Sequence, residues 1–262
     1  KSMIIIQPSG GLCNRMRVFN FGWMLSQERK EHLLVLWNCK SELNCPFEDL
    51  FQPVKEFRIT DIRSVASPRK LFYQKTARTY LTNEEILAHR SPDGRLTADY
   101  VQGLRSNIYI FTWEQFYPAK DYHLFCPTEK MRKRIESMTS GFGPSCVGIH
   151  IRRTDNRPAI GKSSTECFIE CMKKELDNDP DTRFYLATDD LEEERTIRAA
   201  FPGRILSNEK RCLRRDSAEG IQDALLDLYC LANTRKIIGS YFSSFTDIAA
   251  DMRKIPKIIA GE

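Results

Sequence analysis

The sequence predicts an α/β protein built on parallel sheets, and three observations support this prediction. From residue 146 onward, short apolar runs alternate with longer stretches that have helical periodicity. The chain also opens on a strand, a glycine-containing loop, a helix and a second strand. Its 262 residues are enough for two modest domains of this kind. Strands that alternate with helices form parallel, Rossmann-like sheets, because each helix returns the chain to the start of the next strand.

The N-terminal half has fewer regular elements than the C-terminal half. Apolar runs indicate strands at Met3–Ile6, Leu33–Trp37, Glu56–Thr60 and Asn107–Thr112, and helical spacing runs from Met16 to about Glu28. Pro46 begins a turn into a short helix. We expect residues 1–125 to form a Rossmann-like domain on the acceptor side of the molecule.

The C-terminal half shows a clear alternation after a stretch bounded by Pro118 and Pro144, which is the candidate linker. The expected strands are Cys146–Ile151, Arg183–Ala187, Arg204–Leu206, Lys236–Ser240 and Lys257–Ala260, and the expected helices are Thr165–Leu176, Leu191–Ala200, Ala218–Asn233 and Phe245–Met252. We expect residues 126–262 to form a second Rossmann-like domain.

Charged residues follow directly after the first of these strands. His150, Arg152, Arg153 and Asp155 stand at its carboxyl end, where open α/β sheets bind their ligands. Arginine grips phosphate oxygens with a planar, bidentate fork. One hypothesis is that Arg152 and Arg153 neutralise a phosphate while Asp155 orients one of them. The alternative is a surface ion pair between Arg153 and Asp155.

Polar residues also follow two later strands. Ser243 and Ser244 stand at a helix start, where hydroxyls and amides can bind phosphate, although one serine could simply cap the helix. Asp189 and Asp190 follow another strand, and a metal site there remains an alternative. Asp227 lies at the margin of a buried helical stripe, so it needs either a structural arginine or a donor group of a ligand as its partner.

The loop Gly10–Arg15 joins the first strand to the first helix. Its two glycines, Gly10 and Gly11, would let backbone approach a ligand, with amides of the helix N-terminus facing an anion. A tight turn that needs positive φ is the other interpretation. GxGxxG is absent, so this is not a dinucleotide fingerprint.

The amino-acid composition limits the kinds of partner that the protein can bind. The net charge of +5 suits an anionic small ligand, and the basic residues are too dispersed for a nucleic-acid surface. No apolar run is long enough to span a membrane. Nine cysteines without zinc spacing indicate free thiols in a reducing compartment, which favours a cytoplasmic location. Peripheral membrane association and a removed targeting segment before Lys1 stay open.

Taken together, the motifs resemble a fucosyltransferase superfamily that includes α-1,6-, α-1,2- and protein O-fucosyltransferases. The resemblance is carried by His150–Asp155, Tyr185–Asp190, Asp227–Leu231 running into Ser243–Phe245, and Gly10–Arg15. It implies a GT-B fold of two Rossmann-like domains facing across a cleft. It also implies inverting transfer of fucose from GDP-fucose to a glycan or other hydroxyl acceptor, with no metal and no cofactor.

The resemblance also implies roles for individual residues. Arg152 would bind the β-phosphate and, with Asp155, act in catalysis, while Arg153 shapes the cluster and Asp189 holds it together. His150 and Asp227 would contact guanosine, and Ser243, Ser244 and Phe245 would bind phosphate. Gly10, Gly11, Asn14 and Arg15 would approach the donor from the first domain.

One departure concerns the base that deprotonates the acceptor. The α-1,6 enzymes have a lysine directly after the arginine motif and a glutamate soon after it, whereas this chain has Asn156, and Glu166 lies further along. Asp155 and Glu166 are the remaining candidates. The departure allows a catalytically inactive nucleotide- or glycan-binding module, and a different nucleotide sugar is a further alternative. A phosphotransfer enzyme is disfavoured, since a P-loop and an activated nucleophile are both absent.

Overall fold

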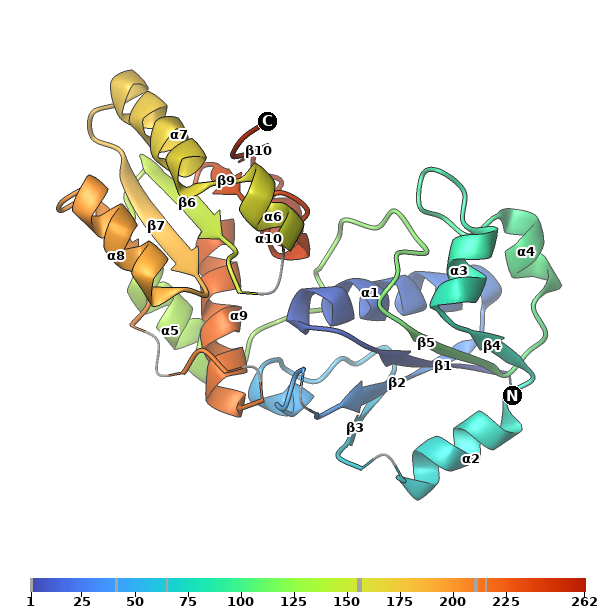
Figure 1. Ribbon diagram of the computed structural model, residues 1–262. Helices are drawn as coiled ribbons and strands as arrows, with labels where there is room; N and C mark the ends of the chain where they lie inside the picture. Colours follow the sequence, from blue (N-terminus) through green and yellow to red (C-terminus); the bar gives the residue numbers. More distant parts are fainter. Residues whose placement is uncertain (1, 41, 65, 155–156, 210–211, 215) are drawn as a thin grey trace. The chain divides into compact units, whose positions relative to one another are not determined.

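The computed structural model describes the chain apart from residues 1, 41, 65, 155–156, 210–211 and 215. Two compact units make up the chain. The N-terminal unit contains residues 1–128 and 214–221, and the C-terminal unit contains residues 129–213 and 222–262. Each unit is built on its own five-stranded sheet (Figure 1).

The sheet of the N-terminal unit is parallel throughout, in the order β3-β2-β1-β5-β4. Its strands are β1 (Met3–Pro8), β2 (His32–Asn38), β3 (Arg58–Ile62), β4 (Thr79–Leu81) and β5 (Ile108–Thr112). Its helices are α1 (Leu12–Arg29), α2 (Pro68–Thr76), α3 (Asn83–His89) and α4 (Ala98–Gly103), with a 3₁₀ turn η1 (Phe47–Asp49).

Alternation along β1 separates the two faces of this sheet. Ile6 faces α1, where Gly22 lets the helix approach so closely that an added Cβ would lie 2.6 Å from the Ile6 side chain. Ile5 points to the opposite face and joins a small core cluster with Leu34, Leu36, Ile62 and Tyr109. Helix α2 packs on that second face (Figure 1).

The sheet of the C-terminal unit is also parallel, in the order β10-β9-β6-β7-β8. Its strands are β6 (Cys146–Ile151), β7 (Arg183–Thr188), β8 (Ile205–Ser207), β9 (Ile237–Gly239) and β10 (Lys257–Ile259). Its helices are α5 (Glu129–Thr139), α6 (Arg157–Lys162), α7 (Thr165–Asn178), α8 (Leu191–Ala200) and α10 (Ser244–Arg253), and α9 (Ala218–Ala232) begins in the N-terminal unit and continues here.

Strand β6 is the central strand and is buried along its whole length. Val147, Ile149 and Ile151 join the core cluster that also holds Phe168 and Met172 of α7 and Ile197 of α8. On the other face, Gly148 admits α9, because an added Cβ would meet Thr234 at 2.8 Å and Leu231 at 3.0 Å. His150 projects from this second face.

The predicted α/β class with a Rossmann-like sheet in each half is confirmed. The strands and helices expected in the C-terminal half all form, with ends shifted by one or two residues. Helices α2, α3, α4 and α6 and strand β4 were not anticipated, because their segments are short and interrupted by polar residues.

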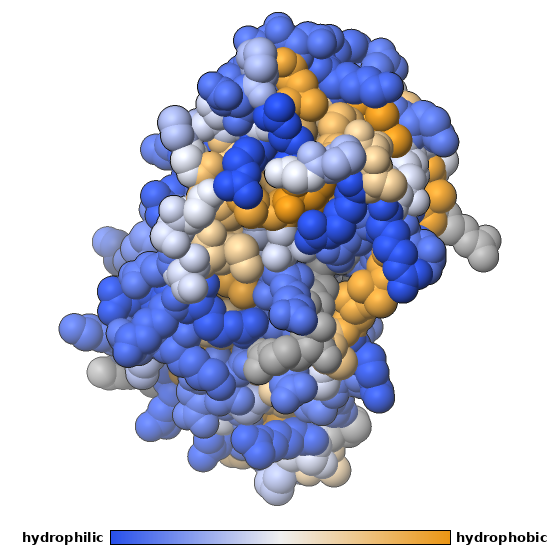
Figure 2. Space-filling model, turned by 90° about the vertical axis from the view of Figure 1, so that its left-hand side faces the viewer, coloured by the Kyte–Doolittle hydropathy of each residue, from blue (hydrophilic) through white to orange (hydrophobic). Residues whose placement is uncertain are grey.

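The surface of the C-terminal unit is mainly hydrophilic, as expected from its charged helices. Figure 2 views this unit from the side of α7 and α8 and shows mainly hydrophilic side chains. Ion pairs within single helices, such as Lys174–Glu170 and Arg198–Glu194, account for part of this surface. Within the described residues, no helix is both long and apolar enough to cross a bilayer.

Candidate functional site

The chain order of the C-terminal sheet reverses at β6. Strands β7 and β8 add on one side of β6, and β9 and β10 add on the other. In such sheets, ligands bind outside the carboxyl ends of the strands at the point of reversal. The segments after β7 and β9 therefore flank Arg152, which follows β6.

Arg152 is held from both neighbouring strands. Its backbone amide donates to the hydroxyl of Ser240, after β9, at 2.9 Å. Its Nε lies 3.3 Å from Oδ2 of Asp189, after β7. Both side chains in this ion pair are about one-fifth exposed, at 21%. The guanidinium is thus fixed in orientation while part of it reaches the surface at the strand ends.

Asp189 collects several donors from the loop after β6. Its carboxylate accepts the backbone amide of Arg153 at 2.8 Å and the hydroxyl of Thr154 at 2.7 Å. Burial acts to raise the pKa of Asp189, but these hydrogen bonds and the charge of Arg152 outweigh it and lower the pKa below its ordinary value. Asp189 is therefore an ionised carboxylate that holds the loop in place.

Arg153 has different surroundings from Arg152. Its guanidinium forms an ion pair with Glu193 of α8 at 3.0 Å and donates to the carbonyl of Ser163 at 2.9 Å. It also donates to the Thr165 hydroxyl at 3.3 Å, and the side chains of Arg153 and Glu193 are each only 10% exposed. Arg153 thus ties the strand end to α7 and α8.

The alternative of a surface ion pair between Arg153 and Asp155 does not describe Arg153. The Arg153 side chain is only 10% exposed and is paired with Glu193, so it is not a surface arginine. Asp155 lies outside the described residues, and so does Asn156. The orienting carboxylates in the described structure are Asp189 for Arg152 and Glu193 for Arg153.

His150 is buried beneath the start of α10. One ring nitrogen, Nδ1, lies 2.8 Å from the hydroxyl of Thr246, and the ring stacks on Phe245 with centroids 4.8 Å apart. Gly239 makes room for this arrangement, since a Cβ there would lie 2.3 Å from Thr246. His150 and Phe245, two of the predicted site residues, are therefore in direct contact.

Asp227 is 5% exposed and lies on α9. The partner expected for it was an arginine or a ligand. The structure provides the Tyr185 hydroxyl, which donates to Oδ1 of Asp227 at 2.7 Å. Burial and the nearby Asp227 charge raise the pKa of Tyr185 well above its ordinary value. The phenol therefore stays protonated and keeps donating.

The serines after β9 do not behave as simple helix caps. Ser243 occupies the N-cap position of α10, and its side chain makes no capping hydrogen bond. Ser244 begins the helix. Before them, Phe242 has a left-handed backbone with φ of 53° and is 80% exposed. The cap interpretation therefore fails for the Ser243 hydroxyl, although Ser243 and Ser244 both stand at the N-terminus of α10.

Asp190 has a structural role. Its carboxylate accepts the amides of Glu192 and Glu193 and so caps α8. Among the described residues, no group of three or more His, Cys, Asp or Glu side chains could hold a metal ion. Both oxygens of Asp189, and Oδ1 of Asp190, accept hydrogen bonds from the protein.

The loop Gly10–Arg15 belongs to the N-terminal unit and follows β1, where the order of that sheet also reverses. Gly10 has φ of +79°, so the turn interpretation holds for this residue. Gly11 has φ of −74° and caps α1, and an added Cβ there would meet no atom within 4 Å. Packing inside the chain therefore does not require a glycine at position 11, and the space beside it is open.

Arg15 holds this loop in place, whereas Asn14 is paired with a side chain of α1. Arg15 is only 1% exposed, and its Nε donates to the Gly10 carbonyl at 2.7 Å while its Nη1 donates to the Asn38 carbonyl. Burial lowers its pKa to about 10, which leaves it charged at neutral pH. Asn14 accepts a hydrogen bond from Arg17 at 2.8 Å. Arg15 therefore positions the loop.

Glu166, the second candidate for a base, lies exposed in the first turn of α7. Its own backbone amide and the Ser164 hydroxyl hold its pKa below the ordinary value. A carboxylate with a lowered pKa is a weaker base, so its position favours the structural role at a helix start.

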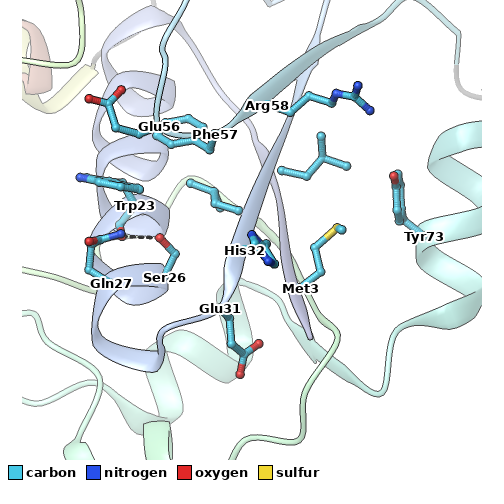
Figure 3. A pocket seen from close by; sticks show the side chains of 12 residues that line it. Met3, Trp23, Ser26, Gln27, Glu31, His32, Glu56, Phe57, Arg58 and Tyr73 are labelled. Carbon is cyan, nitrogen blue, oxygen red and sulfur yellow. Dashed lines mark hydrogen bonds between the residues drawn. The ribbon is translucent and has the colours of Figure 1, made fainter. Parts of the chain in front are cut away.

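A cavity of about 410 Å³ lies at the opposite end of the N-terminal sheet, where β1 and β2 begin. Figure 3 shows Trp23, Glu56, Phe57, Arg58 and Tyr73 around it. None of the predicted site residues lines it.

Several residues that hold the site were not identified from the sequence, among them Thr246, Glu193 and Ser163. Glu193 stands three positions after the helix-capping Asp190, a pattern that flags a capping box, yet its carboxylate turns to Arg153 and Thr165. Ser163 is fully buried, donates to the Ala260 carbonyl and accepts the Tyr241 amide. No local signal marks Ser163.

Comparison with known proteins shows which fold this is. No protein-family profile matches the chain, and no curated protein sequence matches it. Among solved structures, the α-1,6-fucosyltransferase NodZ, in a crystal soaked with GDP-fucose, aligns over 96% of this chain and 92% of its own, with a TM-score of 0.66 and 18% identity. NodZ from Bradyrhizobium aligns over 95% of this chain and 91% of its own, with a TM-score of 0.65 and 17% identity.

A second enzyme has the same fold. POFUT1 in complex with GDP aligns over 100% of this chain and 98% of its own, with a TM-score of 0.65 and 12% identity. The chain therefore has the two-domain α/β fold of the GT-B fucosyltransferases. The resemblance inferred from the motifs is confirmed at the level of the fold.

Proposed function

We propose that this chain is a glycosyltransferase that transfers fucose from GDP-fucose to a glycan or another hydroxyl acceptor, with inversion and without a metal ion. One observation carries the proposal. Arg152 stands at the carboxyl end of β6, at the reversal point of the sheet, oriented by Asp189 and partly exposed. Solved structures of the same fold with GDP or GDP-fucose support the choice of nucleotide.

The chemistry needs a fixed positive charge. Breaking a glycosyl–phosphate bond gives an oxocarbenium-like sugar and a diphosphate whose negative charge grows as it leaves. A guanidinium already oriented toward that charge stabilises the transition state more than the ground state. In this proposal Arg152 supplies the charge that a divalent metal supplies in other glycosyltransferases, and Arg153 holds the loop through Glu193 and Ser163.

The other predicted residues surround this charge. The hydroxyls of Ser243 and Ser244, with the amides at the start of α10, including that of Phe245, bind phosphate oxygens in the proposal. His150 and Asp227 contact the guanosine, with their orientation fixed by Thr246 and Tyr185.

The N-terminal unit contributes its first loop. The Gly11 amide, with Gly10 and Asn14 beside it, approaches the donor in the proposal, and Arg15 shapes the loop from within. Asp155 is the carboxylate that we propose as the base, because it stands only two positions after Arg153 in the sequence and Glu166 has a lowered pKa.

Calorimetry with GDP in metal-free buffer tests the nucleotide assignment. We expect binding without Mg²⁺ and a loss of roughly 2–5 kcal/mol of binding free energy in Arg152→Ala, the range for a buried charge contact. Arg195→Ala is the matched control, since Arg195 forms only an exposed ion pair with Glu192. A strict Mg²⁺ requirement, or equal affinity in both variants, would reject the proposal.

Asn156, where the α-1,6 enzymes have lysine, favours a second candidate function, a binding module without catalysis. Release of free GDP from GDP-fucose in the absence of acceptor distinguishes the two. An enzyme releases GDP slowly and loses this activity in Arg152→Ala, whereas a binding module holds GDP-fucose unchanged. UDP and other nucleotide sugars in the same assay test the identity of the donor.

A further inference from the structure

Helix α2 has an unusual environment for a helix of a folded domain. None of its residues, Pro68–Thr76, is buried. Tyr73, followed by Ala77 just after the helix, packs against the core cluster on the second face of the N-terminal sheet. Figure 3 shows Tyr73 projecting from this helix toward the sheet. The helix is thus attached by one edge, and the remaining surface faces solvent.

The outward face of α2 is apolar at its centre. Leu71 is 49% exposed and Phe72 is 60% exposed. At 100° per residue, Leu71 lies about 160° and Phe72 about 100° from the direction of Tyr73, with Lys75 between them. The exposed ring of Phe72 also contacts the ring of Tyr73 edge-on, with centroids 5.5 Å apart. Leu71 and Phe72 are adjacent and both exposed, so they form one continuous apolar surface rather than two scattered residues, and continuous apolar surface is typical of interaction sites.

Positive charge surrounds this apolar centre. Arg63, Arg69, Lys70, Lys75 and Arg78 all lie in or beside α2, and the sequence contains no Asp or Glu between Asp61 and Glu84. Lys40 adds another cation close to Lys70, whose pKa is lowered by burial and by the Lys40 charge. The segment around α2 therefore carries an uncompensated positive charge.

The basic helix α5 shows that this arrangement is particular to α2. On α5, Arg132 and Lys133 form ion pairs with Glu129 and Glu136. Within the described part of the chain, no carboxylate forms an ion pair with Arg69, Lys70 or Lys75. The α2 cations are thus available to an external anionic partner, and those of α5 are largely neutralised.

We propose that α2 binds the surface of an anionic phospholipid bilayer, with Leu71 and Phe72 inserted among the acyl chains and Arg69 and Lys75 against the headgroups. A bilayer accepts both components at once, because its interior takes the apolar pair and its anionic headgroups take the cations. An acidic protein or a nucleic acid would match the charge but would leave Leu71 and Phe72 without a comparable apolar phase.

Co-sedimentation with vesicles tests this proposal on the intact chain. We expect binding to vesicles of phosphatidylcholine mixed with phosphatidylglycerol, weak or no binding to phosphatidylcholine alone, and a decrease as salt is raised. Leu71→Ser with Phe72→Ser should lower the partition coefficient roughly tenfold or more. Arg69→Glu with Lys75→Glu should lower it by at least a similar factor, at roughly fivefold for each cation removed.

Matched controls distinguish vesicle binding through the α2 surface from non-specific binding. Leu87→Ser removes another exposed leucine of the same unit, 50% exposed, and Lys130→Glu with Lys133→Glu alters the basic helix α5. Neither should change vesicle binding by more than about twofold. Circular dichroism and GDP affinity should be unchanged in the α2 variants, since their substituted side chains are exposed.

Three results would overturn the proposal: no binding to the anionic vesicles, equal binding to neutral vesicles, or anionic binding that the α2 substitutions leave unchanged. Binding to an acidic protein or to nucleic acid that is sensitive to Arg69→Glu with Lys75→Glu but not to Leu71→Ser with Phe72→Ser would also count against a bilayer. The vesicle result is independent of the proposed transferase activity, because α2 lies in the N-terminal unit and Arg152 in the C-terminal unit.

Discussion

Arg152 and Arg153 are neighbours in the sequence, but they have different surroundings. Arg153 is enclosed by Glu193, Thr165 and the Ser163 carbonyl, whereas Arg152 is held by Ser240 through its backbone amide and by Asp189 through its guanidinium, and remains partly exposed. Side chains alternate in direction at a strand end, so adjacent residues meet different elements. At the residue scale, one arginine therefore supports the loop, and the other is the one that we propose to bind an anion.

Asp189→Asn should reduce stability in a pH-dependent way. The pKa of Asp189 is lowered in the folded chain, so its ionised form contributes stability that is present above the unfolded pKa of about 3.9 and is lost as pH falls further. The difference in unfolding free energy between the parent and the variant should thus be largest near neutral pH and shrink below about pH 4.

Urea titrations across this pH range measure that difference. Asp177→Asn, at an exposed position on α7, is the control for the substitution itself. A difference for Asp189→Asn that does not change between neutral pH and acid would contradict the role given to the carboxylate.

At the scale of elements, the loop between β1 and α1 contains two glycines with different roles. Gly10 needs its positive φ, and Gly11 needs neither a special backbone conformation nor extra space inside the chain. A glycine without a structural requirement is the place where an external group can approach the backbone closely. Arg15 fixes this loop from beneath, through the Gly10 carbonyl.

Gly10→Ala and Gly11→Ala should therefore separate stability from activity. Gly10→Ala forces an alanine into left-handed backbone and should destabilise the chain by about 1–2 kcal/mol. Gly11→Ala should leave the unfolding free energy within about 0.5 kcal/mol of the parent but lower the release of GDP from GDP-fucose. Denaturant titration and the hydrolysis assay read out the two effects, and unchanged hydrolysis in Gly11→Ala would remove this loop from the proposed donor site.

At the scale of the whole molecule, two parallel sheets each reverse strand order beside a polar loop. The C-terminal unit carries the arginine cluster, the buried His150 and the serines before α10. This unit brings polar groups from three adjacent strand ends together, namely Ser240 after β9, Arg152 after β6 and Asp189 after β7. It is the unit expected to hold the nucleotide.

GDP should accordingly protect the C-terminal unit first. At a GDP concentration about 100 times the dissociation constant, the gain in stability should be about 2.7 kcal/mol without added metal. Hydrogen–deuterium exchange should show slower exchange after β6, after β7 and at the start of α10. Protection confined to residues 2–128, or stabilisation that appears only with Mg²⁺, would contradict the assignment.

The sequence by itself determined the alternating α/β pattern, the location of charged residues at strand ends and the glycine loop after the first strand. These features depend on local periodicity, which each segment carries on its own. The strand order β10-β9-β6-β7-β8 is compatible with this pattern, but the sequence alone does not determine it.

Only the tertiary structure decided which group each charged side chain meets. Arg153 meets Glu193, 40 residues away, and Asp227 meets Tyr185, 42 residues away. The exposed face of α2 is likewise visible only once Tyr73 is seen against the sheet. Such contacts depend on how distant strands and helices pack, because burial selects a partner for each polar group only after the fold has formed.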